Sequence, residues 1–311
     1  MTNFEPRSFF PADTFGEVLD VVRIPMGMSA AAVYSVTTEK GAFILRIHGS
    51  DRQAWQQASL LQALAADHGV APPLVMLDKN AAATISVKID GMAIGQAVAD
   101  PTRRAIILGS LADQLGALHR IPTAGISPRD SMAMSRRIWQ QQSQRQGFPA
   151  WALPLQKRLD DADQVLARDQ RQVFSHCDPN PTNIMWDGHR VWLVDWEVAG
   201  LAHPYLDLSI IANFLALADG TGLELLRRQE QAALNDDQEK TFATLRHLTR
   251  VVFGTVFLSL IPDLSAVKFA NPADAPSLLE CYGLMAAGKL RMQDPAGQAQ
   301  VGTALLVQAL I

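Results

Sequence analysis

The segment from residue 174 to residue 195 constrains the fold of this chain most. It carries His176, Asp178 and Asn183 in the spacing His-x-Asp-x-x-x-x-Asn. Two short apolar runs separated by an Asp-Gly pair follow, and Asp195 comes directly after the second run. Such a combination of polar residues and strand signals predicts a polar loop attached to a β-hairpin.

The hairpin prediction does not depend on the spacing of the polar residues. Residues 184–186 and 191–194 read as strands, and Asp-Gly between them is a strong turn signal. Asn183 and Asp195 are equally far along the chain from His189, near the turn. Because paired strands lie about 5 Å apart, the hairpin brings Asn183 and Asp195 close together at one end.

The residue types indicate the chemistry. The spacing resembles a kinase catalytic loop, in which the Asp accepts the proton of the substrate hydroxyl and the Asn and a later Asp hold Mg²⁺. Phosphoryl transfer mainly requires positioning and charge neutralisation, which oxygen ligands of hard cations provide. Asp178 is therefore the candidate base, and Asn183 and Asp195 are candidate metal ligands. Glu197 would lie on the side of Asp195 if the strand continued, so it is a further candidate metal ligand.

Composition narrows the class of protein. The chain has 311 residues, of which 48% are hydrophobic and 19% charged, as in a globular protein with two domains or lobes. A net charge of −4 without a dense basic block favours neither nucleic acid nor an anionic membrane as partner. Two cysteines fit a reduced compartment better than a disulfide scaffold. Without a recognisable signal peptide or a run long enough to span a bilayer, we expect a cytoplasmic protein.

The N-terminal part of the chain is rich in strand signals. Residues 21–24, 32–36 and 42–47 read as strands, and a turn of small residues separates the first two. Only Gly27 in this turn is free to adopt unusual backbone dihedrals. Ser29 would still let backbone amides approach phosphates, so both residues are candidates for nucleotide contact.

Arg46 lies on the third predicted strand. It alternates with Leu45 and Ile47, so its side chain points away from the face that those two residues bury. Protein kinases place a phosphate-pairing Lys on this strand, and Arg can grip phosphate oxygens with its own donors. The predicted helix at residues 51–67 contains no Glu to pair with this cation, which leaves Gln57 as the candidate partner.

Two further strands, at residues 74–76 and 84–89, complete the β-rich part. The backbone around Ile89 could hydrogen-bond an adenine edge, and Asp90-Gly91 is a turn suited to a hinge. Helical patterns dominate afterwards, beginning at residues 101–119. We therefore predict an α+β, bilobal fold, with a small antiparallel N-terminal nucleotide-binding lobe at 1–90 and a large helical lobe at 91–311 that holds the catalytic loop, metal site and acceptor pocket.

Together these residues resemble the aminoglycoside phosphotransferase and choline kinase superfamily, a branch of the protein-kinase-like fold that acts on small molecules. The resemblance extends over about residues 24–214 and is most specific over 176–183 and 195–207. Asp-Trp-Glu at 195–197, followed by Ala-Gly at 199–200, is similar to the choline, ethanolamine and thiamine kinase branch.

The resemblance implies a role for each matching residue. Asp178 would be the catalytic base and His176 would support its loop. Asn183 and Asp195 would bind Mg²⁺, and Arg46 would contact the phosphates of ATP. The implied reaction transfers the γ-phosphoryl group of ATP to the hydroxyl of a small metabolite. We expect a cationic metabolite similar to choline, and the candidate aromatic faces for it are Trp139, Trp151, Trp196 and Tyr205.

Two alternatives stay open at this point. The acceptor could be an aminoglycoside or a related antibiotic. The chain could also be a catalytically silent nucleotide-binding module, because the helix lacks a Glu and the small-residue turn is poor in glycine. The oligomeric state and the choice between ATP and GTP do not follow from the sequence.

Overall fold

The computed structural model describes residues 5–24, 31–48, 51–269 and 271–311. Within these ranges an antiparallel sheet comes first along the chain and helices dominate afterwards. This order confirms the predicted α+β class, with a β-rich N-terminal part and a mainly helical C-terminal part.

The chain forms two compact units, and each is built from two separate segments. The first unit comprises Met1–Ile126 and His176–Gly200. The second comprises Ser127–Ser175 and Leu201–Ile311. The predicted lobe boundary at residues 90 and 91 marks the change from strands to helices along the chain and stays a prediction. All the predicted catalytic, metal-binding and nucleotide-contacting residues that the structure describes belong to the first unit, whereas Trp139, Trp151 and Tyr205 belong to the second.

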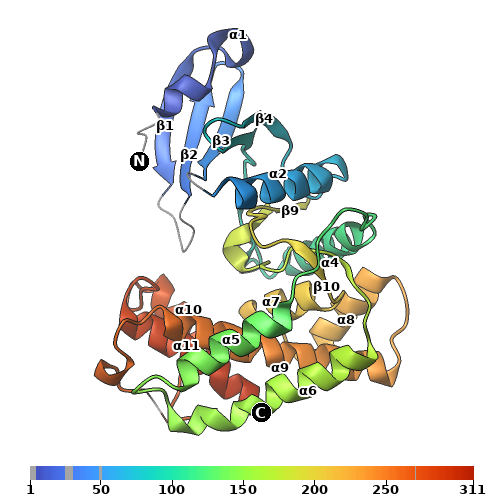
Figure 1. Ribbon diagram of the computed structural model, residues 1–311, viewed down its shortest axis with the longest axis vertical. Coiled ribbons are helices and arrows are strands. Elements are labelled where there is room, and N and C mark those ends of the chain that lie inside the picture. Colours follow the sequence, from blue (N-terminus) through green and yellow to red (C-terminus); the bar gives the residue numbers. More distant parts are fainter. Residues whose placement is uncertain (1–4, 25–30, 49–50, 270) are drawn as a thin grey trace. The chain divides into compact units, whose positions relative to one another are not determined.

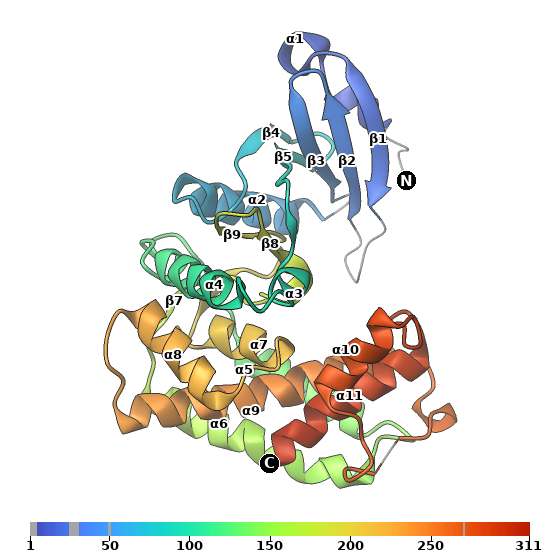
Figure 2. The same cartoon turned by 180° about the vertical axis from the view of Figure 1, so that it is seen from behind.

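A five-stranded sheet forms the core of the first unit. The order is β1-β2-β3-β5-β4 and each neighbouring pair is antiparallel. Figures 1 and 2 show β1, β2 and β3 side by side in this sheet. The strands are β1 (Val18–Ile24), β2 (Ala32–Thr38), β3 (Gly41–Ile47), β4 (Leu74–Asp78) and β5 (Ala83–Val87).

One face of this sheet is apolar because side chains alternate along each strand. On β3, Leu45 and Ile47 are buried in a core cluster with Val36 and Ile85. The short elements η1 (Pro6–Phe9) and α1 (Ala12–Phe15) cover this face with phenylalanines, which also belong to the cluster. Arg46 lies on the opposite face, as the alternation predicts.

The first unit also contains a second, smaller sheet. This sheet has the order β6-β8-β9 and contains the predicted hairpin. Helix α2 follows the third strand of the larger sheet, and Asp51 caps its N-terminus by accepting a hydrogen bond from the Ala54 N–H at 2.9 Å. The elements are α2 (Arg52–Asp67), β6 (Met92–Ala93), α3 (Ile94–Ala97), α4 (Arg104–His119), η3 (Pro181–Asn183), β8 (Ile184–Trp186) and β9 (Val191–Leu193).

The second unit is organised around its longest helix, α9. Asn235 and Gln238 form a capping box at its start, which satisfies N–H groups that the helix leaves unpaired. Helices α5, α6, α7 and α11 pack against α9 (Figure 2). The elements are α5 (Ser131–Ser143), η2 (Ala150–Leu155), α6 (Gln156–Arg168), β7 (Val173–Ser175), β10 (Gly200–Ala202), α7 (Leu206–Phe214), α8 (Asp219–Glu230), α9 (Asp236–Ser259), η4 (Leu264–Ala266), α10 (Leu278–Ala286) and α11 (Pro295–Leu310).

Two details of this unit follow from single residues. The pattern at residues 151–167 predicts one helix, but Pro154 lacks an N–H donor and the segment divides into η2 and α6. Helices α9 and α11 approach closely at Gly254 and Gly302. A Cβ atom added to either glycine would lie 3.0 Å from the backbone oxygen of the other.

Candidate active site

The predicted catalytic loop begins after β7 and ends in the single turn η3. Cys177 has a left-handed backbone conformation, with φ of 64°, which is uncommon for a residue other than glycine. His176 is fully buried, and its Nε2 donates to the Val194 carbonyl oxygen at 2.9 Å. Its ring also packs edge-on against Trp196, with centroids 4.8 Å apart. His176 thus ties the loop to the end of the hairpin, and its role in supporting catalysis stays a prediction.

The carboxylate of Asp178 contacts two side-chain amides. Asn180 Nδ2 donates to both carboxylate oxygens at 3.1 Å. Asn183 Nδ2 donates to Oδ2 at 3.1 Å and to the backbone oxygen of Asp178 at 3.0 Å. The structure therefore brings Asp178 and Asn183 together and adds Asn180, which was not predicted. The sequence offered one signal for Asn180: it is an amide two residues after Asp178, and it lies between two prolines.

The hairpin prediction is confirmed. Ile184 pairs with Leu193 and Trp186 with Val191. The Val194 N–H donates to the Asn183 carbonyl oxygen at 2.9 Å, so Asp195 lies one residue beyond the partner of Asn183. The two predicted metal ligands therefore meet at the same end of the hairpin.

The side chains of Asp195 and Glu197 both reach Arg46, but strand alternation is not the cause. Strand β9 ends at Leu193, and Asp195 is left-handed with φ of 69°, so the argument that a continuing strand aligns Glu197 with Asp195 is wrong. Instead the backbone turns, and the Glu197 N–H bonds to the Asp195 carboxylate. Trp196 between them is buried, and its Nε1 donates to the Leu193 carbonyl oxygen at 3.1 Å.

Arg46 reaches this turn from β3. Its Nη1 donates to Asp195 Oδ1 and to Glu197 Oε1, at 2.7 Å in each case. Burial alone lowers the pKa of Arg46, but the hydrogen bonds and charges of the two carboxylates outweigh it and raise the pKa above its ordinary value. Burial raises the pKa of Asp195, but the hydrogen bond and charge of Arg46 outweigh that effect and hold the pKa below its usual range.

His48 is a second unpredicted neighbour of this cluster. It follows β3 two residues after Arg46, and its Nδ1 lies 3.8 Å from Glu197 Oε1. Burial, followed by the charge of Arg46, lowers the pKa of His48 to about 4. The imidazole is therefore neutral at pH 7. The two-residue spacing along the strand was a signal that could have placed it beside Arg46.

The other residues predicted to contact nucleotide are less informative. Gly27 and Ser29 lie outside the described residues. Ile89 is half-buried and follows the end of β5, where the neighbouring Lys88 N–H donates to the Ala42 carbonyl oxygen at 3.0 Å. Gln57 is half-buried on α2, and among the described residues the hydrogen-bond partners of the Arg46 side chain are the two carboxylates.

Three of the four aromatic residues suggested for a cationic acceptor are packed in the interior. Trp139, Trp196 and Tyr205 are at most 4% exposed, whereas Trp151 is half-buried. Trp139 packs edge-on against Phe148, with centroids 5.6 Å apart. Packing against other side chains therefore accounts for the three buried rings.

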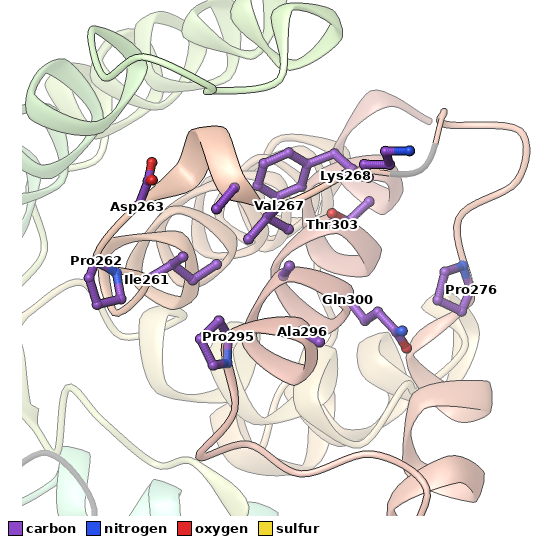
Figure 3. Close-up of a pocket in the computed structure, with 13 residues that line it drawn as sticks. Ile261, Pro262, Asp263, Val267, Lys268, Pro276, Pro295, Ala296, Gln300 and Thr303 are labelled. Atoms are coloured by element: carbon purple, nitrogen blue, oxygen red, sulfur yellow. The ribbon is translucent and has the colours of Figure 1, made fainter.

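The second unit contains a pocket of about 550 Å³. Pro262 and Val267 from the segment after α9, and Ala296 and Thr303 from α11, contribute to its lining (Figure 3). The pocket is mostly apolar, and none of the predicted catalytic or metal-binding residues lines it.

In the part of the chain that the structure describes, no group of three or more His, Cys, Asp or Glu side chains is arranged to hold a metal ion. The described helices include none with the length and hydropathy needed to cross a membrane.

Comparison with known families identifies the class of protein. The model of the phosphotransferase enzyme family matches residues 20–246. This range covers more than half of the 311 residues, so the chain belongs to that family. The prediction of an enzyme, a small-molecule phosphotransferase, is confirmed. No curated protein sequence matches the chain.

Solved structures show the same fold. A choline/ethanolamine kinase family protein from Mesorhizobium loti is 19% identical, with a TM-score of 0.63 over 93% of this chain and 92% of that one. Choline kinase LicA from Streptococcus pneumoniae is 16% identical, with a TM-score of 0.61 over 94% of each chain. An aminoglycoside phosphotransferase from Streptomyces rimosus is 20% identical, with a TM-score of 0.52 over 73% of this chain and 92% of that one. These similarities confirm the predicted protein-kinase-like fold.

Proposed function

We propose that this protein is an ATP- and Mg²⁺-dependent kinase that phosphorylates the hydroxyl of a small metabolite similar to choline, ethanolamine or thiamine. One observation carries the proposal. Asp178 and Asn183 are hydrogen-bonded to each other, and Asp195 at the same end of the hairpin is ion-paired with Arg46. A base, oxygen ligands and a cation that could contact phosphate are thus gathered within one compact unit.

Asp178 is the group that we assign to the acceptor. Its carboxylate takes the proton of the acceptor hydroxyl as that oxygen bonds to the γ-phosphorus. The bond between the γ-phosphorus and the bridging oxygen breaks, and ADP leaves with the bonding electrons. The amides of Asn180 and Asn183 donate hydrogen bonds to this carboxylate and hold it in place.

The donor set at the end of the hairpin fits Mg²⁺. Asn183 and Asp195 offer oxygen atoms, the ligands that this ion prefers. The carboxylate of Asp195 already binds a cation, the guanidinium of Arg46, so this position attracts positive charge. Bound there with ATP, the metal would neutralise charge on the phosphate oxygens. The AMP that is bound in one LicA structure supports the assignment of an adenine nucleotide.

Support for the acceptor class comes from the similar structures and from one sequence feature. The choline and ethanolamine kinases among them act on small amino alcohols, and Asp-Trp-Glu at residues 195–197 is similar to that branch. An antibiotic acceptor is the second candidate, because aminoglycoside phosphotransferases share the fold.

The test is ADP release with Mg·ATP and a panel of choline, ethanolamine, thiamine, aminosugars and aminoglycosides. We expect one amino alcohol or thiamine-like acceptor to stimulate release, and Asp178→Asn to abolish the stimulation while ATP still binds. Asp67→Asn, which changes an exposed carboxylate at the end of α2, is the matched control and should behave as wild type.

Each other outcome has a distinct meaning. Stimulation by an aminoglycoside alone would replace the metabolite with an antibiotic as acceptor. ATP binding in calorimetry without transfer to any acceptor would favour the silent nucleotide-binding module. Full activity of Asp178→Asn would remove Asp178 from the role of base.

A further inference from the structure

The phosphate-contacting cation of this protein lacks the partner that kinases usually provide. In protein kinases the strand Lys pairs with a Glu on the following helix. Helix α2, which follows β3 here, contains no Glu, and its Gln57 does not bond to Arg46 among the described contacts. Arg46 instead bonds to two carboxylates that lie about 150 residues later in the chain.

We assign different roles to the two carboxylates, Asp195 and Glu197, that bond to Arg46. Arg46, Asp195 and Glu197 together carry one net negative charge, so the cluster can accept a second cation. Asp195 directly follows Val194, whose N–H donates to the Asn183 carbonyl oxygen, whereas Glu197 comes two residues later. Both carboxylates hold the Arg46 guanidinium at 2.7 Å. We assign Asp195 the further task of holding the metal with Asn183, whereas Glu197 holds the guanidinium both with and without the metal.

Local structure fixes Glu197 for this task. The left-handed Asp195 and the bond from the Glu197 N–H to the Asp195 carboxylate turn both side chains toward β3. Trp196 anchors the turn from its buried position. The side chain of Arg46 is 18% exposed and that of Glu197 30%, so the pair is partly shielded from water and its geometry matters more than at the surface.

We propose that Glu197 is a positioning residue that holds Arg46 for contact with the nucleotide phosphates, in place of the acid missing from α2. The inference rests on the proposed function, because it assumes that ATP binds at Arg46. The role differs from the one predicted from sequence, in which Glu197 reaches the metal. The two roles give opposite results when magnesium is removed.

The experiment measures ATP affinity by calorimetry, once in EDTA and once with Mg²⁺. In EDTA, we expect Arg46→Met to weaken ATP binding by about 10- to 100-fold, the range of a charge-assisted hydrogen bond. Glu197→Gln should weaken it by about tenfold in EDTA. The double variant should bind ATP no more weakly than Arg46→Met alone, because Glu197 acts through Arg46.

Magnesium separates the roles of the two carboxylates. We expect Asp195→Asn to remove most of the gain in ATP affinity that Mg²⁺ gives, whereas Glu197→Gln should keep that gain. Glu224→Gln, an exposed glutamate on α8, is the matched control and should equal wild type in both conditions. If Glu197→Gln does not fold, Glu197→Asp keeps the charge, shortens the side chain, and should also weaken binding in EDTA.

Three results would overturn the inference. Wild-type affinity of Glu197→Gln in EDTA, with a loss only when Mg²⁺ is present, would make Glu197 a metal ligand. Independent, additive losses in the double variant would show that Glu197 does not act through Arg46. Failure of the wild-type protein to bind ATP in either condition would overturn the proposed function, and this inference with it.

Discussion

At the scale of single residues, the site depends on a carboxylate that is held in place before any substrate arrives. Asn180 donates to both oxygens of Asp178, and its own Oδ1 accepts from the Thr182 N–H at 2.9 Å. Asn180 is therefore fixed at one end and orients Asp178 with the other. A carboxylate held in this way loses little conformational freedom when an acceptor hydroxyl approaches.

We expect Asn180→Ala to lower kcat by about 10- to 100-fold, because an unheld carboxylate meets the hydroxyl in a productive orientation less often. ATP affinity should change little, since Asn180 contacts neither Arg46 nor Asp195 in the described structure. Steady-state kinetics and calorimetry measure the two quantities. Asn80→Ala, which removes an exposed amide in the turn between β4 and β5, is the matched control. Unchanged kcat in Asn180→Ala would show that Asp178 is oriented without it.

Single residues also mark the limit of prediction from sequence. Asp178, Asn183, Asp195 and Arg46 are recognisable because their spacing and the hairpin signals repeat a known arrangement. Glu197 was placed beside Asp195 by strand alternation, whereas the actual cause is the left-handed turn at Asp195, a backbone feature that residue type does not reveal. The spacing along the strand places His48 beside Arg46, but its approach to Glu197 joins segments about 150 residues apart, which local patterns cannot indicate.

At the scale of elements, a hydrogen bond between Asp169 and His203 connects the end of α6 to the segment between β10 and α7. Asp169, which follows α6, lies 2.7 Å from Arg171 Nη2 and 3.2 Å from His203 Nε2. The hydrogen bond from Arg171, which outweighs the effect of burial, holds the pKa of Asp169 well below its usual range, and His203 adds to this. A carboxyl with a depressed pKa stabilises the fold above its unfolded pKa of about 4, and this contribution is lost as pH falls toward the folded value.

Asp169→Asn should therefore reduce the free energy of unfolding at pH 7 by about 1–2 kcal/mol. The difference from wild type should shrink as pH falls below about 4, where the unfolded carboxyl becomes protonated. Denaturant unfolding between pH 7 and pH 3 measures both. A difference that stays constant over this range would contradict the assignment to the charge of Asp169.

The contact of α9 with α11 gives a prediction about packing. Gly254→Val should destabilise the protein by about 1–3 kcal/mol, because the new side chain would press on the backbone of α11 at Gly302. Gly283→Ala on α10 is the matched control, since a Cβ there meets no atom within 4 Å and alanine favours the helix. Thermal unfolding measures both variants. Equal stability of Gly254→Val and wild type would mean that the helices can separate without cost.

The predicted boundaries of helices and strands agree with the observed ones where local sequence signals are strong. The hairpin, the five strands of the larger sheet and helices such as α2 and α4 were all predicted within a few residues, because alternation, caps and turn residues agree there. The short strands β6, β7 and β10 have too few residues to show a period, so pairing with distant partners decides them. Pro154 lies in the last turn of η2, where that element gives way to α6, although the apolar pattern at residues 151–167 continues across it.

At the scale of the whole molecule, the candidate catalytic residues belong to the unit that contains the N-terminal sheet. The segment His176–Gly200 joins Met1–Ile126 in one compact body, although 49 residues of the other unit, Ser127–Ser175, separate them in the chain. This arrangement lets Arg46 and Asp195 meet within one body. The composition along the chain predicts a β-rich part followed by a helical part, but it does not predict this return of the chain.

The central claim is that Asp178, Asn183, Asp195 and Arg46 form a phosphotransfer site. The most direct test follows the ³¹P NMR spectrum of the wild-type protein with Mg·ATP and the acceptor that stimulates ADP release most. We expect one phosphate monoester of the acceptor for each ADP formed, and no ester with Asp178→Asn although that variant still binds ATP. Ester formation at the wild-type rate by Asp178→Asn, or no ATP binding by the wild-type protein, would contradict the claim.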